Sequence, residues 1–228
     1  GMDPQQRPFL EEAWKTLEHA GHAGDDIVGS ECGVFVGCSH GDYQELFDAN
    51  IPGQAFWCNT SSLIPARISY WLDLKGPAVT VDTACPSSLV AVNMACRSIW
   101  DGECKSALAG GVFVQSGPRF FRSANQAQML SPSGNCAAFG EMADGIVPGE
   151  AVAAVLLRPL SDAIADGDTI YGVIVGTAQS GRCNYGITAP SAKSQERLIR
   201  KVQRDFDIDA NSIGMIEAHG TGTQLGDP

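Results

Sequence analysis

The stretch VTVDTACPSSLVAV, from Val79 to Val92, places a single cysteine between a strand pattern and a helix pattern. Residues 79–81 form a short apolar run typical of a buried strand. An apolar stripe with helical spacing follows, made of Leu89, Val90, Ala91, Met94 and Ala95. Pro86 suits the first turn of a helix, because its missing N–H would have no partner there. Cys85 therefore lies at or just before the positive end of a helix dipole, where a thiolate is favoured.

Two interpretations of Cys85 stay open on this stretch alone. Cysteine is among the residue types most often buried, and a strand-to-helix junction is an ordinary place for a small apolar side chain. The same position also suits an activated nucleophile. Only a partner elsewhere in the chain can decide between them.

Strand and helix patterns alternate along the rest of the chain. Strands are predicted at 32–37, 78–82, 105–114, 151–160, 171–179 and 212–218. Helices are predicted at 62–74, 86–100, 161–168 and 191–206, after a first helix whose apolar stripe is Phe9, Leu10, Ala13, Trp14 and Leu17. Several strands are apolar on both faces, which is typical of sheets covered by helices on each side. The sequence therefore predicts an α/β layered fold.

Composition and charge narrow the class of protein. With 228 residues, 44% of them hydrophobic and 18% charged, the chain is long enough for one large domain or two small ones. Its net charge of −11 argues against nucleic-acid binding, which needs a basic surface. The eight cysteines include no CxxC pair and no zinc-ligand spacing, so we expect reduced thiols and no metal site. No apolar run is long enough to span a bilayer and no secretory signal is present, so a cytoplasmic location is expected.

The glycine-rich segment HGTGTQLGD, at 219–227, follows the last predicted strand. It lacks the lysine of a P-loop, and no G-x-G-x-x-G opens a helix, so the case for phosphate binding is weak. Its glycines let a ligand approach the backbone, and Thr221 and Thr223 offer hydroxyls. A histidine after a strand is commonly a structural residue. His219 is also a plausible catalytic partner for Cys85, because cysteine nucleophiles often work with a histidine distant in sequence. The other histidines are predicted at the surface: His19, His22 and His40.

Two motifs together indicate a family. VDTACPSSLVAV (81–92) resembles the active-site cysteine motif of β-ketoacyl synthases, and EAHGTGTQLGDP (217–228) resembles their first histidine motif. Other segments agree in order and spacing: MDPQQR (2–7), ARISYWLDLKGPAVTVDTAC (66–85), MLSPSGNC (129–136), ADGIVPGEA (143–151) and GITAPSAKSQERLI (186–199). The resemblance covers essentially the whole chain and is to a ketosynthase domain of a modular polyketide synthase. ADGIVPGEA favours an assembly line served by a free-standing acyltransferase.

The resemblance implies a fold and a reaction. The fold is a thiolase-like layered α-β-α-β-α arrangement, present here as most of the N-terminal half (about 1–160) and the start of the C-terminal half (about 161–228). A homodimer is implied, with residues 78–82 along its interface. In the implied reaction, Cys85 takes an acyl chain from the phosphopantetheine arm of an acyl carrier protein. A malonyl-type extender then loses carbon dioxide, and its carbanion attacks the Cys85 thioester. No cofactor is bound by the domain itself.

The resemblance also gives each site residue a role. Cys85 supplies the thiolate and one backbone donor to the oxyanion. His219 stabilises the enolate through an imidazole N–H, and Thr221 and Thr223 hydrogen-bond the pantetheine arm. Three positions depart from the family pattern: Pro86 stands where serine is usual, Gly140 where aspartate is common, and Ala151 where glycine is common. Helix geometry tolerates Pro86, and the other two are expected to act on loop shape.

The family pattern extends past both ends of this sequence. Its first strand is expected before Met2, and its lysine and second histidine motifs, with the loop that supplies the second oxyanion donor, are expected after Pro228. A chain of residues 1–228 is therefore predicted to be inactive in condensation. Two other functions stay open: a ketosynthase of fatty acid synthesis, and a non-catalytic fragment that only binds or accepts acyl thioesters.

Overall fold

The structure is a computed structural model, and it describes residues 1–47, 53–181 and 190–227. The chain divides into two compact units. The first contains Gly1–Gly117 and Glu150–Val173, and the second contains Pro118–Gly149 and Ile174–Pro228. Cys85 belongs to the first unit, whereas His219, Thr221 and Thr223 belong to the second.

The described residues of the first unit form a four-stranded mixed sheet in the order β2-β1-β3-β4. The strands are β1 (Cys32–Cys38), β2 (Ala78–Val81), β3 (Ser106–Phe113) and β4 (Ala151–Leu157). β1 runs parallel to β2 and β3, and β4 runs antiparallel to β3. All seven residues of β1 are buried, because both faces of this strand are covered. The four strands predicted for this part of the chain are confirmed.

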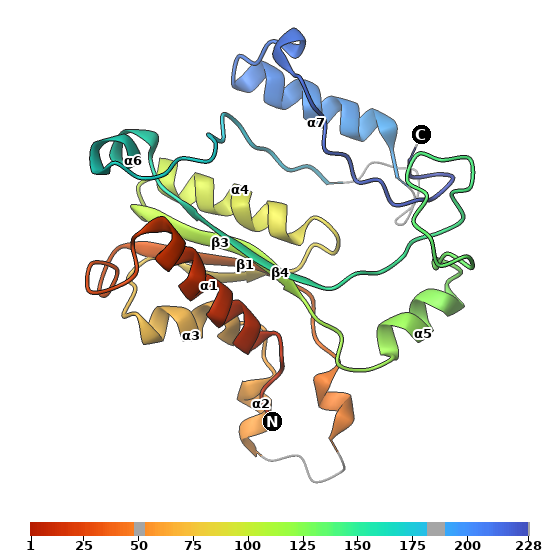
Figure 1. Cartoon of the computed structure of the whole chain (residues 1–228), viewed down its shortest axis with the longest axis horizontal. Coiled ribbons are helices and arrows are strands. Elements are labelled where there is room, and N and C mark those ends of the chain that lie inside the picture. Colours follow the sequence, from red (N-terminus) through yellow and green to blue (C-terminus); the bar gives the residue numbers. More distant parts are fainter. Residues whose placement is uncertain (48–52, 182–189, 228) are drawn as a thin grey trace. The chain divides into compact units, whose positions relative to one another are not determined.

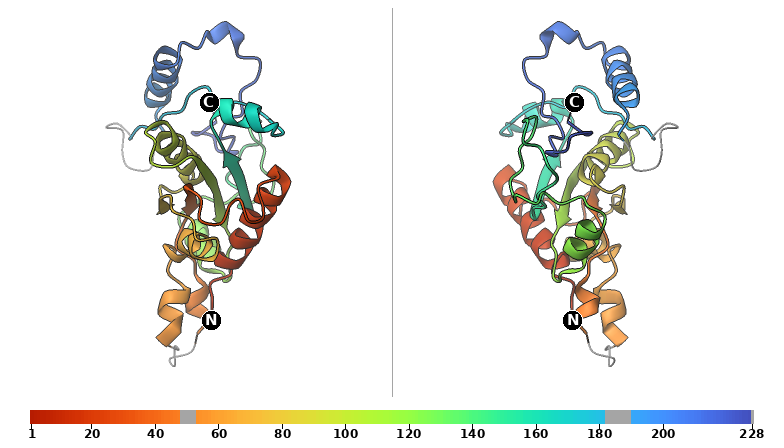
Figure 2. Two further views of the ribbon diagram at one scale, coloured as in Figure 1. Left: turned by 90° about the vertical axis from the view of Figure 1, so that its left-hand side faces the viewer. Right: turned by 90° about the vertical axis from the view of Figure 1, so that its right-hand side faces the viewer.

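Helices cover both faces of the sheet (Figure 1). On one face, α1 (Gln6–Ala20) and α3 (Leu63–Trp71) bury Phe9, Leu17 and Ile68 against β1 and β3. On the other face, α4 (Ser87–Trp100) buries Ala91 and Ala95 among small residues of the strands. Figure 2 shows α1 and α4 on opposite sides of the strands. The first unit is therefore a three-layered α-β-α sandwich, and its second face is packed closely because alanines meet alanines.

The remaining elements are short or belong to the second unit. In the first unit they are the 3-10 turn Tyr43–Leu46, α2 (Gly53–Cys58) and α6 (Leu160–Asp166). In the second unit they are α5 (Arg119–Gln126), α7 (Ala192–Asp205) and the 3-10 turn Ala210–Ser212. The helices predicted at 161–168 and 191–206 are thus confirmed within one or two residues. None of the helices in the described residues is both long enough and apolar enough to cross a membrane.

Two predicted strands, 171–179 and 212–218, are wrong. Both segments are rich in β-branched residues, but the structure assigns neither to a strand. A strand needs a hydrogen-bonded neighbour and a covering layer. Neither segment has a partner strand among the described residues, and Tyr171, Met215 and Ile216 are each 80% exposed. Local propensity alone does not make a sheet.

The predicted surface positions of the other histidines are only partly right. His19 and His40 are exposed, although His19 stacks on Tyr171. His22 is half-buried between two charged side chains. Its Nε2 lies 2.9 Å from the Asp168 carboxylate and 3.1 Å from the Arg158 guanidinium. This cluster fastens the end of α1 to the segment that follows β4.

Two buried glutamines hold the MDPQQR segment against its neighbours. Gln5 accepts the N–H of Val114 at 3.2 Å and donates to the Ser39 carbonyl at 3.3 Å. Gln6 donates to the Cys58 carbonyl at 2.9 Å. Both side chains are 2% exposed, and buried amides hold their position only when they are hydrogen-bonded. Through Gln5, the MDPQQR segment holds the residues that directly follow β1 and β3.

Candidate active site

Cys85 lies in a tight turn between the end of β2 and the start of α4, with its side chain exposed. The residue before it, Ala84, has φ +62°, a left-handed conformation that non-glycine residues adopt at some cost. Pro86 is the N-cap of α4, and its carbonyl accepts the N–H of Val90 at 2.9 Å. The predicted position of Cys85 just before a helix N-terminus is confirmed.

Hydrogen bonds from two polar side chains hold this turn. Asp82 accepts the N–H of Ala84 at 3.0 Å and the hydroxyl of Ser39 at 3.3 Å. Ser87 accepts the N–H of Thr83 at 2.9 Å and donates to the Ala84 carbonyl at 2.6 Å. These four bonds over-determine the backbone on both sides of Cys85, so the left-handed Ala84 can persist. Sequence analysis did not assign roles to Asp82 and Ser87, although an aspartate two residues before a turn residue is a known turn signal.

Two glycines let the first turn of α4 lie directly on the sheet. Gly37 of β1 and Gly111 of β3 are partners in the strand register. A Cβ on Gly37 would lie 2.4 Å from backbone atoms of Ser87 and Ser88, and one on Gly111 would lie 2.8 Å from the Ser88 side chain. The backbone N–H of Cys85 meets no acceptor within the described ranges. The helix therefore presents an exposed thiol beside a free backbone donor.

The other cysteines lie in different surroundings. Cys32, Cys38, Cys96 and Cys104 are buried, Cys58 is half-buried and Cys136 is exposed. Burial, together with the charges of Asp3 and Asp82, raises the pKa of the Cys38 thiol to about 12. Burial likewise raises the pKa of Cys32 and of Cys96. These six thiols and that of Cys85 are free, and Cys183 lies outside the described residues. In the described part of the chain, no group of three metal-ligating side chains comes together.

The HGTGT segment forms a tight loop in the second unit. Gly220 and Gly222 take left-handed conformations, with φ +53° and φ +70°. The hydroxyls of Thr221 and Thr223 lie 2.9 Å apart. The structure thus brings together the two predicted arm-binding residues, and His219, two positions before Thr221, is exposed. Because Cys85 and His219 lie in different units, their partnership stays a prediction.

A second loop of the same unit closes around the HGTGT loop. Its base is closed by a bridge between Leu130 and Ile146. Within it, Gly145 donates to the Gly222 carbonyl at 3.0 Å, and the Cys136 thiol lies 3.7 Å from the Gly220 carbonyl. These contacts connect the MLSPSGNC and HGTGT motifs directly.

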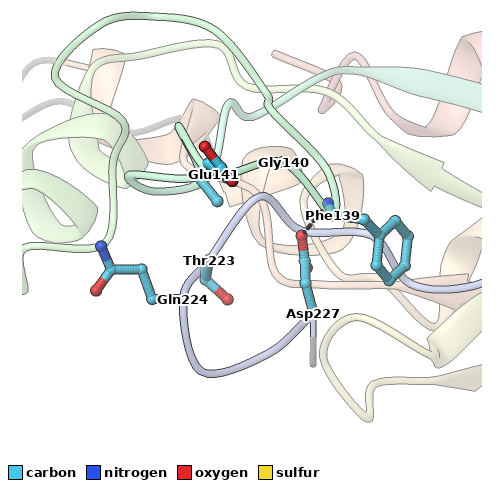
Figure 3. A pocket seen from close by; sticks show the side chains of 7 residues that line it. Phe139, Gly140, Glu141, Thr223, Gln224 and Asp227 are labelled. Atoms are coloured by element: carbon cyan, nitrogen blue, oxygen red, sulfur yellow. Dashed lines mark hydrogen bonds between the residues drawn. The ribbon is translucent and has the colours of Figure 1, made fainter.

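A pocket of about 300 Å³ lies between these two loops (Figure 3). It is lined by Phe139, Gly140, Glu141, Ala143, Thr223, Gln224 and Asp227. Among the three departures from the family pattern, Gly140 lines this pocket, Pro86 caps α4 and Ala151 begins β4. Sequence analysis did not identify a role for Asp227, whose carboxylate faces Phe139 in Figure 3.

A mixed sheet between helical layers, with an exposed cysteine in a strained turn at a helix start, agrees with the thiolase-like fold expected from the sequence. The chain belongs to the β-ketoacyl synthase family: residues 1–163 match its N-terminal domain and residues 171–228 match its C-terminal domain. Fold and family therefore agree with the expectation from the sequence.

Curated relatives and solved structures of ketosynthases resemble the whole chain. It is 48% identical to the polyketide synthase PksM of Bacillus subtilis and 47% identical to a mycocerosic acid synthase-like polyketide synthase of Mycolicibacterium smegmatis. The whole chain is matched, but only 5% and 11% of those two proteins.

Among solved structures, the ketosynthase from module 6 of the bacillaene synthase of Bacillus subtilis shares 43% identity at a TM-score of 0.91. The oxazolomycin ketosynthase domain OzmH KS7 of Streptomyces albus shares 38% sequence identity at a TM-score of 0.88. Each match covers 99% of this chain and 39% or 40% of the other chain.

Proposed function

We propose that this chain is the part of a condensing enzyme of polyketide biosynthesis that carries its nucleophile, Cys85, and its first active-site histidine, His219. The observation that carries the proposal is the cysteine turn. Its thiol is exposed, its backbone N–H is free, and its conformation is held by Asp82 and Ser87. A buried structural cysteine would need none of these features. Membership of a family whose similar members here are polyketide synthases favours this function over fatty acid synthesis.

The first step is acyl transfer. The Cys85 thiolate attacks the carbonyl of an acyl thioester carried on the phosphopantetheine arm of an acyl carrier protein. The new carbon–sulfur bond forms, the arm leaves as its thiolate, and that thiolate takes a proton from solvent. During attack the carbonyl oxygen gains negative charge, which the free N–H of Cys85 can stabilise. The start of α4 favours the thiolate through its dipole.

The second step is condensation. A malonyl-type thioester loses carbon dioxide, and the electron pair of the broken carbon–carbon bond forms an enolate. An imidazole N–H of His219 stabilises this enolate, and its carbon attacks the Cys85 thioester. A carbon–carbon bond forms, and Cys85 leaves as its thiolate. Thr221 and Thr223 hold the arm of the incoming thioester.

The proposal includes a partner and an assembly. The partner is an acyl carrier protein, which supplies both thioesters. The assembly is a homodimer formed along β2, because β2 is an edge strand of the described sheet and an exposed strand edge invites pairing. The division of the chain near residue 160 and a cytoplasmic location also stay predictions. Light scattering tests the dimer, and a stable monomer at micromolar concentration would contradict it.

The test of the function separates acyl transfer from condensation. The 228-residue chain is incubated with an acyl N-acetylcysteamine thioester, and intact mass spectrometry follows the added acyl group. We expect slow acylation that Cys85→Ala abolishes and that Cys136→Ala leaves unchanged, since Cys136 is the other exposed cysteine among the described residues. Malonyl carrier protein is then added, and a β-ketoacyl product separates a condensing enzyme from a chain that only accepts acyl groups. Acylation that survives Cys85→Ala would refute the assignment of the nucleophile.

A further inference from the structure

Three side chains at the end of the HGTGT loop form one line of hydrogen bonds. The hydroxyl of Thr223 lies 2.9 Å from that of Thr221, which lies 3.2 Å from the Asp227 carboxylate. The N–H of Gly226 donates to the Thr223 hydroxyl at 3.1 Å. Asp227 also accepts the N–H of Gly222 at 3.1 Å and that of Phe139 at 2.7 Å.

The direction of every proton in this line follows from its two ends. The N–H of Phe139 is the main cause that lowers the pKa of Asp227, and the Thr221 hydroxyl and the Gly222 N–H add to it. Asp227 is therefore ionised at neutral pH and can only accept. Thr221 has one proton, which goes to Asp227, so the proton between the two hydroxyls must come from Thr223. Both protons point towards Asp227.

This direction decides what the hydroxyls can offer to a ligand. With its proton committed to Thr221, the Thr223 hydroxyl faces the pocket with a lone pair only. Two acidic residues, Glu141 and Asp227, also line the pocket (Figure 3). Such a wall of acceptors suits an N–H donor and repels a phosphate. The pantetheine arm carries two secondary amides, each with one N–H.

We propose that Asp227 is a positioning residue that fixes the direction of the Thr221–Thr223 hydrogen bond, so that Thr223 accepts a hydrogen bond from an amide N–H of the bound arm. The inference rests on the proposed function, in which these threonines hold the arm. Asp227 acts through the two hydroxyls. An asparagine at position 227 could donate its amide proton to Thr221, which would reverse the line and turn Thr223 into a donor.

The experiment compares one ligand with two analogues that each lack one N–H. The ligand is pantetheine without its sulfur atom, and each analogue has an ester oxygen in place of one of the two amide N–H groups. Dissociation constants are measured by NMR titration of the 228-residue chain. We expect the wild-type chain to bind the amide about fivefold more tightly than one of the esters, since that ester leaves an acceptor unpaired. In Asp227→Asn this ratio falls to about one.

Two variants control for loss of loop structure. Asp144→Asn removes a carboxylate of the neighbouring loop that bonds to Ser131 and does not line the pocket, so it keeps the wild-type ratio. Thr223→Val removes the accepting hydroxyl while leaving Asp227 in place, and its ratio also falls to about one. The double variant Asp227→Asn/Thr223→Val should show no further loss, because both substitutions break the same interaction.

The results separate this inference from the function on which it rests. The role of Asp227 is overturned if the wild-type chain binds amide and esters equally or binds none of them. It is also overturned if the ratio is unchanged in Asp227→Asn, or, should that variant fail to fold, if the ratio is unchanged in Thr223→Val. Acylation of Cys85 by an acyl N-acetylcysteamine thioester is measured on the same samples, and its absence counts against the proposed function instead.

Discussion

Replacing Gly37 by alanine should damage the cysteine turn without touching the cysteine. Gly37 lies in β1, under the first turn of α4. The added Cβ would lie 2.4 Å from the carbonyl carbon of Ser87 and from the nitrogen of Ser88. Both atoms belong to the backbone, so no side-chain rotation can relieve the contact. The start of α4 must move away from the sheet.

The size of the effect follows from this distance. Carbon atoms pack best at about 3.5–4.0 Å, so the helix start must move by about 1 Å. Overpacking of this kind typically costs about 1–3 kcal/mol of unfolding free energy. For a chain of this length, a loss of about 2 kcal/mol lowers Tm by roughly 4–8 °C. A displacement of about 1 Å at a reacting group can also slow its reaction about a hundredfold.

Two measurements on one pair of variants test this reasoning. Thermal unfolding gives Tm, and intact mass spectrometry gives the rate of Cys85 acylation by a small acyl thioester. Gly53→Ala is the control, because a Cβ at the start of α2 meets nothing within 4 Å and should leave both quantities near wild type. A Gly37→Ala chain with wild-type Tm and rate would show that close contact between β1 and α4 does not position the nucleophile.

Three further predictions concern other parts of the molecule. Brief iodoacetamide labelling with peptide mapping should modify Cys85 before Cys136, which is also exposed, because Cys85 adjoins a helix N-terminus and Cys136 does not; the opposite order would contradict this. The folded-state pKa of Cys38 is raised to about 12. The buried neutral thiol therefore makes its full contribution to the unfolding free energy below pH 9, and this contribution is lost as the pH rises from 9 to 12. Between pH 8 and pH 10, denaturant titrations should therefore show wild type losing about 1 kcal/mol more than Cys38→Ala, and parallel curves would exclude this cause. Phe9→Ala should lower the unfolding free energy by about 3–5 kcal/mol in the same assay, because the Phe9 side chain is fully buried on the inner face of α1; a loss below 1 kcal/mol would be inconsistent with that burial.

Periodicity and motif position predicted most of the first unit from the sequence. The stripe of α1 and the apolar runs of β1 and β3 are confirmed because each segment is buried by its nearest layers. Trp14, placed on the same stripe, is 40% exposed, since the apolar stripe of α1 is wider than the face it buries. A sequence pattern indicates which residues tend to be buried, but the packing of neighbouring elements decides which residues are buried in the folded chain.

The parts that sequence analysis missed depend on partners that are distant in the chain. The strand pattern of 212–218 has no neighbour to bond among the described residues, so its propensity has no effect. Asp82 and Asp227 are ordinary acidic residues in the sequence, and their roles appear only when the turns bring backbone N–H groups to them. Cys85 was found because its motif combines a strand end with a helix start, which is a local signal.

The contact between the glycines and α4 has a consequence for how the chain folds. Gly37 and Gly111 are partners in the sheet although 74 positions separate them (111 − 37). The turn around Cys85 rests on both strands, and Asp82 of this turn also bonds to Ser39, the residue directly after β1. Non-local strand pairing of this kind is slow, because loop closure precedes any gain from contact. During synthesis, the ribosome must therefore release β3 before the nucleophile can take its reactive geometry. Until then, the Cys85 thiol of the growing chain is not positioned to react. Acylation of Cys85 would then report the completion of the sheet.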